Sequence, residues 1–164
     1  MNRLLRHLRL LDGSASLITG LITSIVFYAS WLCVLPLFST LTRDQMIFFP
    51  ASALVTSRKF LIDAGPSLQM LLMGFFACFI FVMVWAMLTH FVLHRFGFWG
   101  GLIGGALLGL CVYVISFYQL NHFFEWANIL RGPTMLVYFM IVGAFTGGLY
   151  ECIEVEEEDL EVLA

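Results

Sequence analysis

The chain has 164 residues, of which 61% are hydrophobic and 12% are charged, and its mean hydropathy is +0.95. An ordinary soluble domain carries roughly 25% charged residues, so this composition predicts a membrane protein. The formal net charge of −3 is unevenly distributed, because seven of the eleven acidic residues lie after Tyr150. Lysine and arginine do not cluster with aromatic residues on a soluble face, which argues against a nucleic-acid partner.

Four long stretches of the chain contain no Asp, Glu, Lys or Arg. A helix that crosses a hydrocarbon core of about 30 Å needs roughly 20 mostly apolar residues. Trimmed at their glycines and prolines, the stretches predict transmembrane helices at about 17–38, 67–93, 98–120 and 134–150. The predicted fold is therefore all-α. It is one polytopic membrane domain over 1–164, a four-transmembrane-helix bundle with short interfacial helices in the two outer connections.

The N-terminal segment 1–15 is basic, and it sets the predicted orientation. Lys and Arg in short loops favour the cytoplasmic side. The two sides nearly balance, with Arg3, Arg6, Arg9 and Arg95 on one and Arg43, Arg58, Lys59 and Arg131 on the other. Because the first helix usually dominates, we expect both termini in the cytoplasm of a bacterial inner membrane. The first run lacks a small-residue cleavage site, so we expect it to be retained.

The first outer connection is predicted to contain a short interfacial helix over 50–64. Pro50 stands near its start and Gly65 just past its end, in the places where helix boundaries favour these residues. Arg58, Lys59 and Asp63 interrupt its apolar residues. These charges favour a position at the membrane surface over a fifth span.

The second predicted span carries two histidines near its inner end. His90 and His94 are four residues apart, a spacing that can place two imidazoles on one face for a metal. A third ligand is hard to find, because His122 and Glu125 belong to the opposite side in this topology. We interpret the pair as interfacial, with a pH-sensing role as the alternative. The four cysteines share no CxxC or other metal-type spacing, so no metal site and no cofactor is predicted.

The glycine spacing of the third predicted span, in "FWGGLIGGALLG", is the most specific pattern in the chain, and the fourth span repeats it. Such ridges let another backbone approach closely, and van der Waals packing then drives association. A pore would need polar groups facing a lumen, and the third span offers only Tyr113 and Ser116. Helix packing is therefore favoured. The residues indicated for it are Gly101, Gly105, Gly109, Gly143 and Gly147.

The second outer connection, "YQLNHFFEWANILRGPT", mixes hydrogen-bonding groups with aromatic surface. As a helix, 121–131 places polar residues on one half and apolar residues on the other, which is typical of a helix at the membrane surface, with Trp126 as an anchor. A proton-linked site is the alternative. Its candidate residues are His122, Glu125, Asn128 and Arg131.

The acidic C-terminal tail, 151–164, reads "ECIEVEEEDLEVLA". A run of like charges is typical of a solvated, disordered end. The apolar residues between the acids leave an alternative, in which the tail docks on a basic partner.

Two motifs carry a resemblance to a known family. They are "WLCVLPL", Trp31–Leu37, and "FWGGLIGGALLGLCVYVISF", Phe98–Phe117. In the spacing of Trp31 and Pro36, and in Trp99 followed by Gly101 and Gly105, the chain resembles the YagU-type family of small bacterial inner-membrane proteins, over about half of its length. The resemblance implies a link to acid tolerance rather than a known reaction. The proline-rich segments that follow these motifs in the family are altered here, and no catalytic residue is carried over.

The functional prediction follows from what the spans lack. Transporters and membrane enzymes carry ionisable residues within spans, and the predicted spans contain none beyond His90. This argues against a small multidrug antiporter, a quinone-linked thiol oxidoreductase and a four-helix glutathione-type transferase.

We therefore predict a non-enzymatic multi-pass inner-membrane protein, with no catalytic residue. It is expected to act through glycine-mediated helix packing with itself or a partner, in envelope or acid-stress physiology. The alternative is a small proton- or solute-conducting protein that uses the polar outer connector. The expected partners are the lipid bilayer and either a second copy or another membrane protein.

Overall fold

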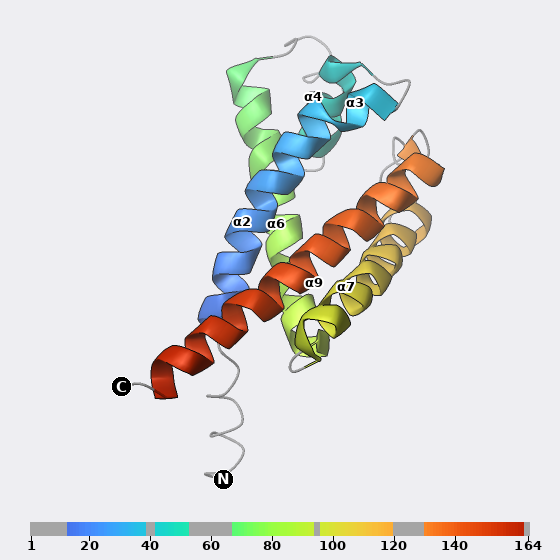
Figure 1. The fold of residues 1–164 in the computed structure, drawn as a ribbon. Helices are drawn as coiled ribbons and strands as arrows, with labels where there is room; N and C mark the ends of the chain where they lie inside the picture. The colour runs from blue at the N-terminus through green and yellow to red at the C-terminus, as the bar shows by residue number, and fades with distance from the viewer. Residues whose placement is uncertain (1–12, 39–41, 53–66, 94–95, 120–129, 163–164) are drawn as a thin grey trace.

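The computed structural model describes residues 13–38, 42–52, 67–93, 96–119 and 130–162 (Figure 1). Helices account for nearly all of this part of the chain, and no strand occurs within it. In order they are α2 (Gly13–Cys33), α3 (Leu35–Phe38), α4 (Arg43–Ser52), α6 (Leu68–Leu93), α7 (Gly97–Val114), the π-helix η1 (Ile115–Gln119) and α9 (Pro133–Val162).

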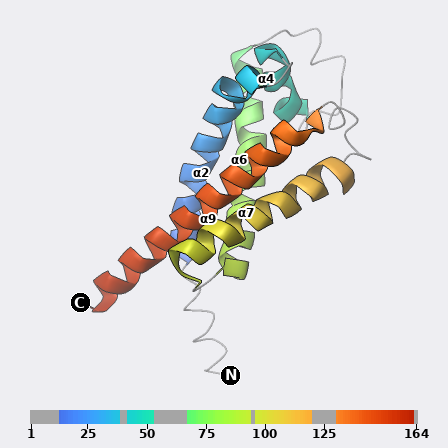
Figure 2. The ribbon, with the colours of Figure 1, turned by 45° about the vertical axis from the view of Figure 1, so that its right-hand side comes forward.

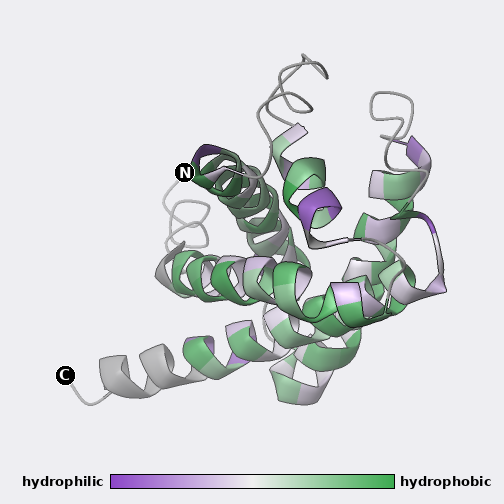
Figure 3. Ribbon diagram, turned by 90° about the horizontal axis from the view of Figure 1, so that it is seen from above, coloured by the Kyte–Doolittle hydropathy of each residue, from purple (hydrophilic) through white to green (hydrophobic). Residues whose placement is uncertain are grey.

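Four helical segments are long and apolar enough to cross a membrane: Ala15–Cys33, Leu68–Leu93, Gly97–Gln119 and Pro133–Glu154. The predicted all-α fold with four spans is confirmed, and the chain is a multi-pass membrane protein. Hydrophobic residues dominate along the long helices (Figure 3). The start of α2 and the end of α9 lie at the same end of the bundle (Figure 1), which is called the terminal end below.

The long helices pack as two pairs. The most extensive contact in the molecule joins α7 to α9, and the next joins α2 to α6. The two pairs meet mainly where α2 lies against α9, while α6 makes smaller contacts with α7 and α9 (Figure 2). Each helix buries a stripe of residues about four apart, such as Gly101, Gly105, Gly109 and Tyr113 of α7. The remaining surface is apolar and suits contact with lipid.

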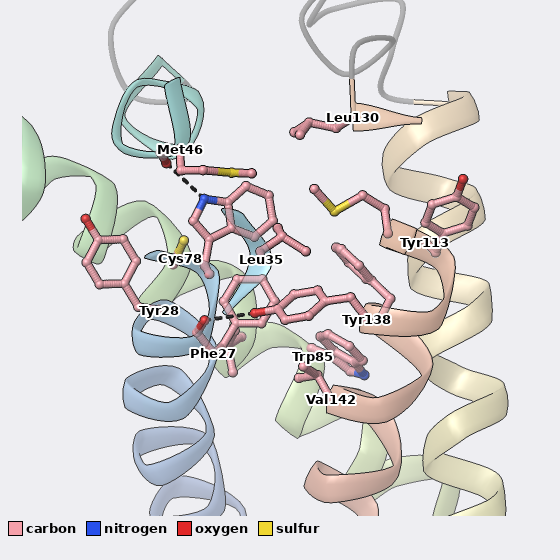
Figure 4. Packing of buried hydrophobic residues seen from close by; sticks show 14 of the residues in the cluster. Phe27, Tyr28, Leu35, Met46, Cys78, Trp85, Tyr113, Leu130, Tyr138 and Val142 are labelled. Atoms are coloured by element: carbon pink, nitrogen blue, oxygen red, sulfur yellow. Dashed lines mark hydrogen bonds between the residues drawn. The ribbon is translucent and has the colours of Figure 1, made fainter. Parts of the chain in front are cut away.

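An aromatic core joins the two pairs, mostly in the half of the bundle away from the terminal end (Figure 4). Tyr138 of α9 donates a hydrogen bond to the carbonyl oxygen of Phe27 of α2, with an oxygen–oxygen distance of 2.9 Å. Its hydroxyl also lies 2.8 Å from the hydroxyl of Ser30. The aromatic rings in contact here include those of Phe27, Trp31, Phe81, Trp85, Tyr138 and Phe139.

The first span ends earlier than the predicted 17–38. α2 stops at Cys33, and the short α3 follows from Leu35. Pro36 explains the break, because a proline has no backbone N–H to donate and its ring clashes with the carbonyl group four residues before it. The other spans begin and end close to their predicted bounds, except the fourth.

The first outer connection contains a helix that no predicted element covers. It is α4, which begins at Arg43 and has Pro50 in its last turn. A capping box explains the start: the backbone N–H of Gln45 donates to the hydroxyl of Thr42 (3.4 Å), and the N–H of Thr42 donates to the side-chain oxygen of Gln45 (3.0 Å). The predicted helix over 50–64 lies mostly outside the described residues.

The acidic tail also differs from the prediction. α9 does not end at Tyr150 but continues as a helix to Val162. Glu151 and Glu154 are 3% and 8% exposed, so these two residues are buried rather than solvated. The fourth span therefore carries carboxyl groups into the bundle.

Candidate functional site

Ionisable side chains are buried at the terminal end of the bundle. His90 of α6 is 9% exposed, and Glu151 and Glu154 of α9 are also buried. Charged or titratable groups within a span are costly, and they mark functional sites more often than structural ones. The name polar cluster is used below for these residues together with their buried polar neighbours: Ser16, Thr19 and Thr23 of α2, Thr89 and His90 of α6, and Tyr150, Glu151 and Glu154 of α9.

The contact between His90 and Tyr150 joins the two helix pairs at this end. The Nδ1 atom of His90 lies 2.5 Å from the hydroxyl oxygen of Tyr150, and the two rings meet edge to face with centroids 5.2 Å apart. Imidazole with its hydrogen on Nε2 accepts the Tyr150 O–H at Nδ1. Imidazolium carries hydrogen on both nitrogens and must donate Nδ1–H to the Tyr150 oxygen. Uptake of one proton therefore reverses the direction of this hydrogen bond.

Glu151 is accommodated between α9 and α7 because its neighbour on α7 is a glycine, Gly101. A methyl group at Gly101 would lie 2.5 Å from Cγ of Glu151 and 2.6 Å from the carbonyl oxygen of Gly147. No L side chain fits there without moving one of them. The glycine at this position thus leaves room both for the α9 backbone and for an acidic side chain.

Three hydroxyls of α2 form a row that faces the interior. Ser16, Thr19 and Thr23 are 5%, 1% and 0% exposed. Within the described part of the chain, none of the three hydroxyl oxygens has a hydrogen-bond partner.

Other buried hydroxyls behave differently. Ser24, Thr89 and Thr146 each donate to the carbonyl oxygen four residues earlier, at 2.6, 3.0 and 2.8 Å. That bond is the ordinary solution for a hydroxyl inside an apolar helix bundle. The row on α2 does not use it.

The level of the row follows from the packing of α2 on α6. A methyl group at Gly20 would contact Sδ of Met83 and Cβ of Ala86. The two helices run in opposite directions (Figure 1), and a helix rises about 1.5 Å per residue. Ser16, four residues before Gly20, therefore lies at the level of His90, four residues after Ala86.

The glycines indicated for helix packing contact one another within the chain. A methyl group at Gly105 would overlap the carbonyl group of Gly143, one at Gly109 would overlap that of Phe139, and one at Gly147 would overlap that of Gly101. The structure therefore brings the backbones of α7 and α9 together along this ridge.

The candidate polar site of the second outer connection is described only at its edge. His122, Glu125 and Asn128 lie outside the described residues. The guanidinium carbon of Arg131 lies 3.5 Å from the ring centroid of Tyr118, a cation–π contact at the two ends of this connection. The proton-linked reading of the connector stays a prediction.

The predicted histidine pair is also only half visible, because His94 lies outside the described ranges. Among the residues with described positions, no group of three or more His, Cys, Asp or Glu side chains could hold a metal ion.

Sequence reasoning missed Tyr150, Glu151 and Glu154 as members of a site. One signal could have found the first glutamate: Gly143, Gly147 and Glu151 continue a single stripe of residues four apart. A stripe that packs against another helix keeps that face buried for as long as the helices stay in contact. The partner of His90 had no such signal, because Tyr150 lies 60 residues away in the chain.

Comparison of the chain with protein families, with curated proteins and with solved structures finds no significant match.

Proposed function

We propose that the chain is a non-enzymatic protein of the bacterial inner membrane that responds to pH through the hydrogen bond between His90 and Tyr150. The observation that carries the proposal is the position of this bond, which connects α6 of one helix pair to α9 of the other. Imidazole is the side chain whose unperturbed pKa lies within the physiological range. Its protonation changes the contact that holds the pairs together at the terminal end.

The packing of the two pairs makes such a change consequential. In the half of the bundle away from the terminal end, Tyr138 links α9 to α2 through Phe27 and Ser30. At the terminal end, the His90–Tyr150 bond links α9 to α6. A reversal of this bond requires the Tyr150 hydroxyl hydrogen to turn to another acceptor. The relative packing of α6 and α9 is thereby coupled to proton uptake.

The groups that face His90 set the electrostatic surroundings of the imidazole. Tyr150 of α9 contacts His90, and Glu151 and Glu154 are buried farther along the same helix. Among the described residues, α2 contributes hydroxyls at this level, and α7 carries no ionisable side chain near this end. The charged side chains buried in the described part of the chain are therefore acidic.

The glycine contacts support packing between two helices of one chain, whereas the sequence pattern predicted that the glycines pack against a second copy or a partner. Gly105 and Gly143 are in contact with each other's helix, so we propose that the ridge holds α7 to α9 within one chain. A second copy or another membrane protein would bind at a different face. The resemblance to the YagU-type family, with its link to acid tolerance, supports a response to pH.

The test compares thermal stability of the purified protein between pH 5 and 8. We expect the melting temperature of His90→Gln to differ from that of the wild type by an amount that changes across this range, because the variant lacks the titrating group. His122→Ala and Glu125→Gln serve as controls. Their free energy of unfolding should stay within about 0.5 kcal/mol of the wild-type value at each pH.

Parallel stability curves for the wild type and His90→Gln would contradict the proposal. A second readout is growth under acid stress at equal expression. The proposal expects a selective loss in His90→Gln, whereas a selective loss in Glu125→Gln would move the pH response to the outer connector.

A further inference from the structure

Four buried polar atoms in the interior have no hydrogen-bond partner in the described part of the chain. They are the hydroxyl oxygens of Ser16, Thr19 and Thr23 and the indole nitrogen Nε1 of Trp85. All four belong to the facing helices α2 and α6, in the half of the bundle nearer the terminal end. Buried polar groups without a protein partner are the places where ordered water is found in proteins.

The four atoms follow one line along the bundle. From the packing of Gly20 against Met83 and Ala86, Thr19 lies at the level of Trp85, and Ser16 lies at the level of His90. The line starts with Ser16, at the level of His90, and ends with Thr23, about one turn beyond Trp85. The Trp85 ring belongs to the aromatic core, where it stacks on Phe139 with ring centroids 5.8 Å apart and planes inclined by 13°.

The spacing of the hydroxyls fits bridging water. Side chains three and four residues apart on a helix have Cβ atoms about 5–6 Å apart. One water molecule that bonds to two hydroxyls through hydrogen bonds of about 2.8 Å joins oxygens that are about 4.5 Å apart, and at most about 5.6 Å apart. A water between Ser16 and Thr19 and another between Thr19 and Thr23 would therefore satisfy all three groups. The indole N–H, which can only donate, also finds an acceptor in water.

We propose that a file of water molecules enters the bundle from the terminal end and runs along Ser16, Thr19 and Thr23, passing the indole N–H of Trp85 at the level of Thr19. This inference rests on the proposed function, because such a file supplies the protons that His90 takes up and releases. The aromatic core closes the file toward the opposite end of the membrane. The protein thus admits water to half of its thickness and is sealed in the middle.

The test measures the reactivity of single introduced cysteines with a small, charged methanethiosulfonate reagent. Thr19→Cys and Thr23→Cys are made in the full-length protein, reconstituted in lipid nanodiscs so that the reagent reaches both faces. Peptide mass spectrometry locates the label, so the four native cysteines stay in place and the fold is not put at risk.

Two matched controls lie at similar depth. Leu21→Cys replaces a residue that is 50% exposed on the lipid-facing side of α2, and Val82→Cys replaces a fully buried apolar residue of α6. Only a thiolate reacts with the reagent, and thiolates form in water rather than in lipid or in an apolar core. We expect Thr19→Cys and Thr23→Cys to react at least about tenfold faster than either control.

Equal, slow labelling at all four positions would overturn the inference and would show that the hydroxyls are satisfied by their own helix. The same proteins carried through the pH series separate the two proposals. Slow labelling of Thr19→Cys and Thr23→Cys, together with a stability difference that depends on pH through His90, would overturn the water file and leave the proposed function standing. Fast labelling of these two cysteines, without a pH-dependent stability difference between the wild type and His90→Gln, would support the water file and overturn the proposed function.

Discussion

At the scale of single residues, His90 shows what the sequence could and could not predict. Its place near the end of the second span was clear from the chain, and it was interpreted as interfacial. The structure buries it and gives it Tyr150 as a hydrogen-bond partner. A contact between two helices of different pairs depends on tertiary packing, and no local pattern around His90 reports it.

Replacement of Tyr150 by Phe isolates that contact. The variant keeps the ring, which is fully buried, and removes the hydroxyl that meets His90. We expect the free energy of unfolding to fall by about 0.5–1.5 kcal/mol, the usual contribution of one such hydrogen bond. Equilibrium unfolding in mild detergent measures it. Tyr118→Phe, at an exposed position, is the control, and an equal effect of both variants would remove the special role of Tyr150.

At the scale of helices, the span positions were predictable because hydrophobic length and glycine or proline boundaries are local properties. Two differences from the predicted elements have local causes. Pro36 ends α2 at Cys33, before the predicted end at 38. The helix α4, which no predicted element covers, starts at the capping box of Thr42 and Gln45. The burial of Glu151 was hidden by the acidic composition that follows it.

Replacement of Gly105 by Leu tests the contact between α7 and α9. Any side chain at Gly105 meets the carbonyl group of Gly143 and the backbone of Gly147, and a backbone cannot yield as a flexible side chain can. We expect a loss of at least about 1–3 kcal/mol of stability, the range typical of overpacking. Leu107→Phe, at a position that is 56% exposed to lipid, is the matched enlargement.

The measurement is thermal stability in detergent, together with the yield of folded monomer by size exclusion. The packing account expects Leu107→Phe to resemble the wild type. Wild-type stability for both variants would show that the ridge tolerates separation of the two backbones.

At the scale of the whole molecule, four spans require the two ends of the membrane domain to face the same compartment. Reporter fusions should decide which one. We expect fusions at Ala164 and in the loop at Arg95 to report the cytoplasm, because the three arginines before the first span favour that side. Fusions near Asp44 or Asn128 should report the outside. The opposite result at Ala164 and Asn128 would invert the molecule, and the polar cluster would then lie toward the other side of the membrane.

The length of α6 exceeds the thickness of the hydrocarbon core of a bilayer. Its spanning part has 26 residues, which correspond to about 39 Å of helix. A hydrocarbon core of about 30 Å accommodates such a helix only if it tilts or projects. A thinner bilayer therefore increases the tilt required of α6, which packs on α2 at Gly20. Sliding between the two helices along Gly20 would then carry a change in membrane thickness directly to the polar groups that lie between them.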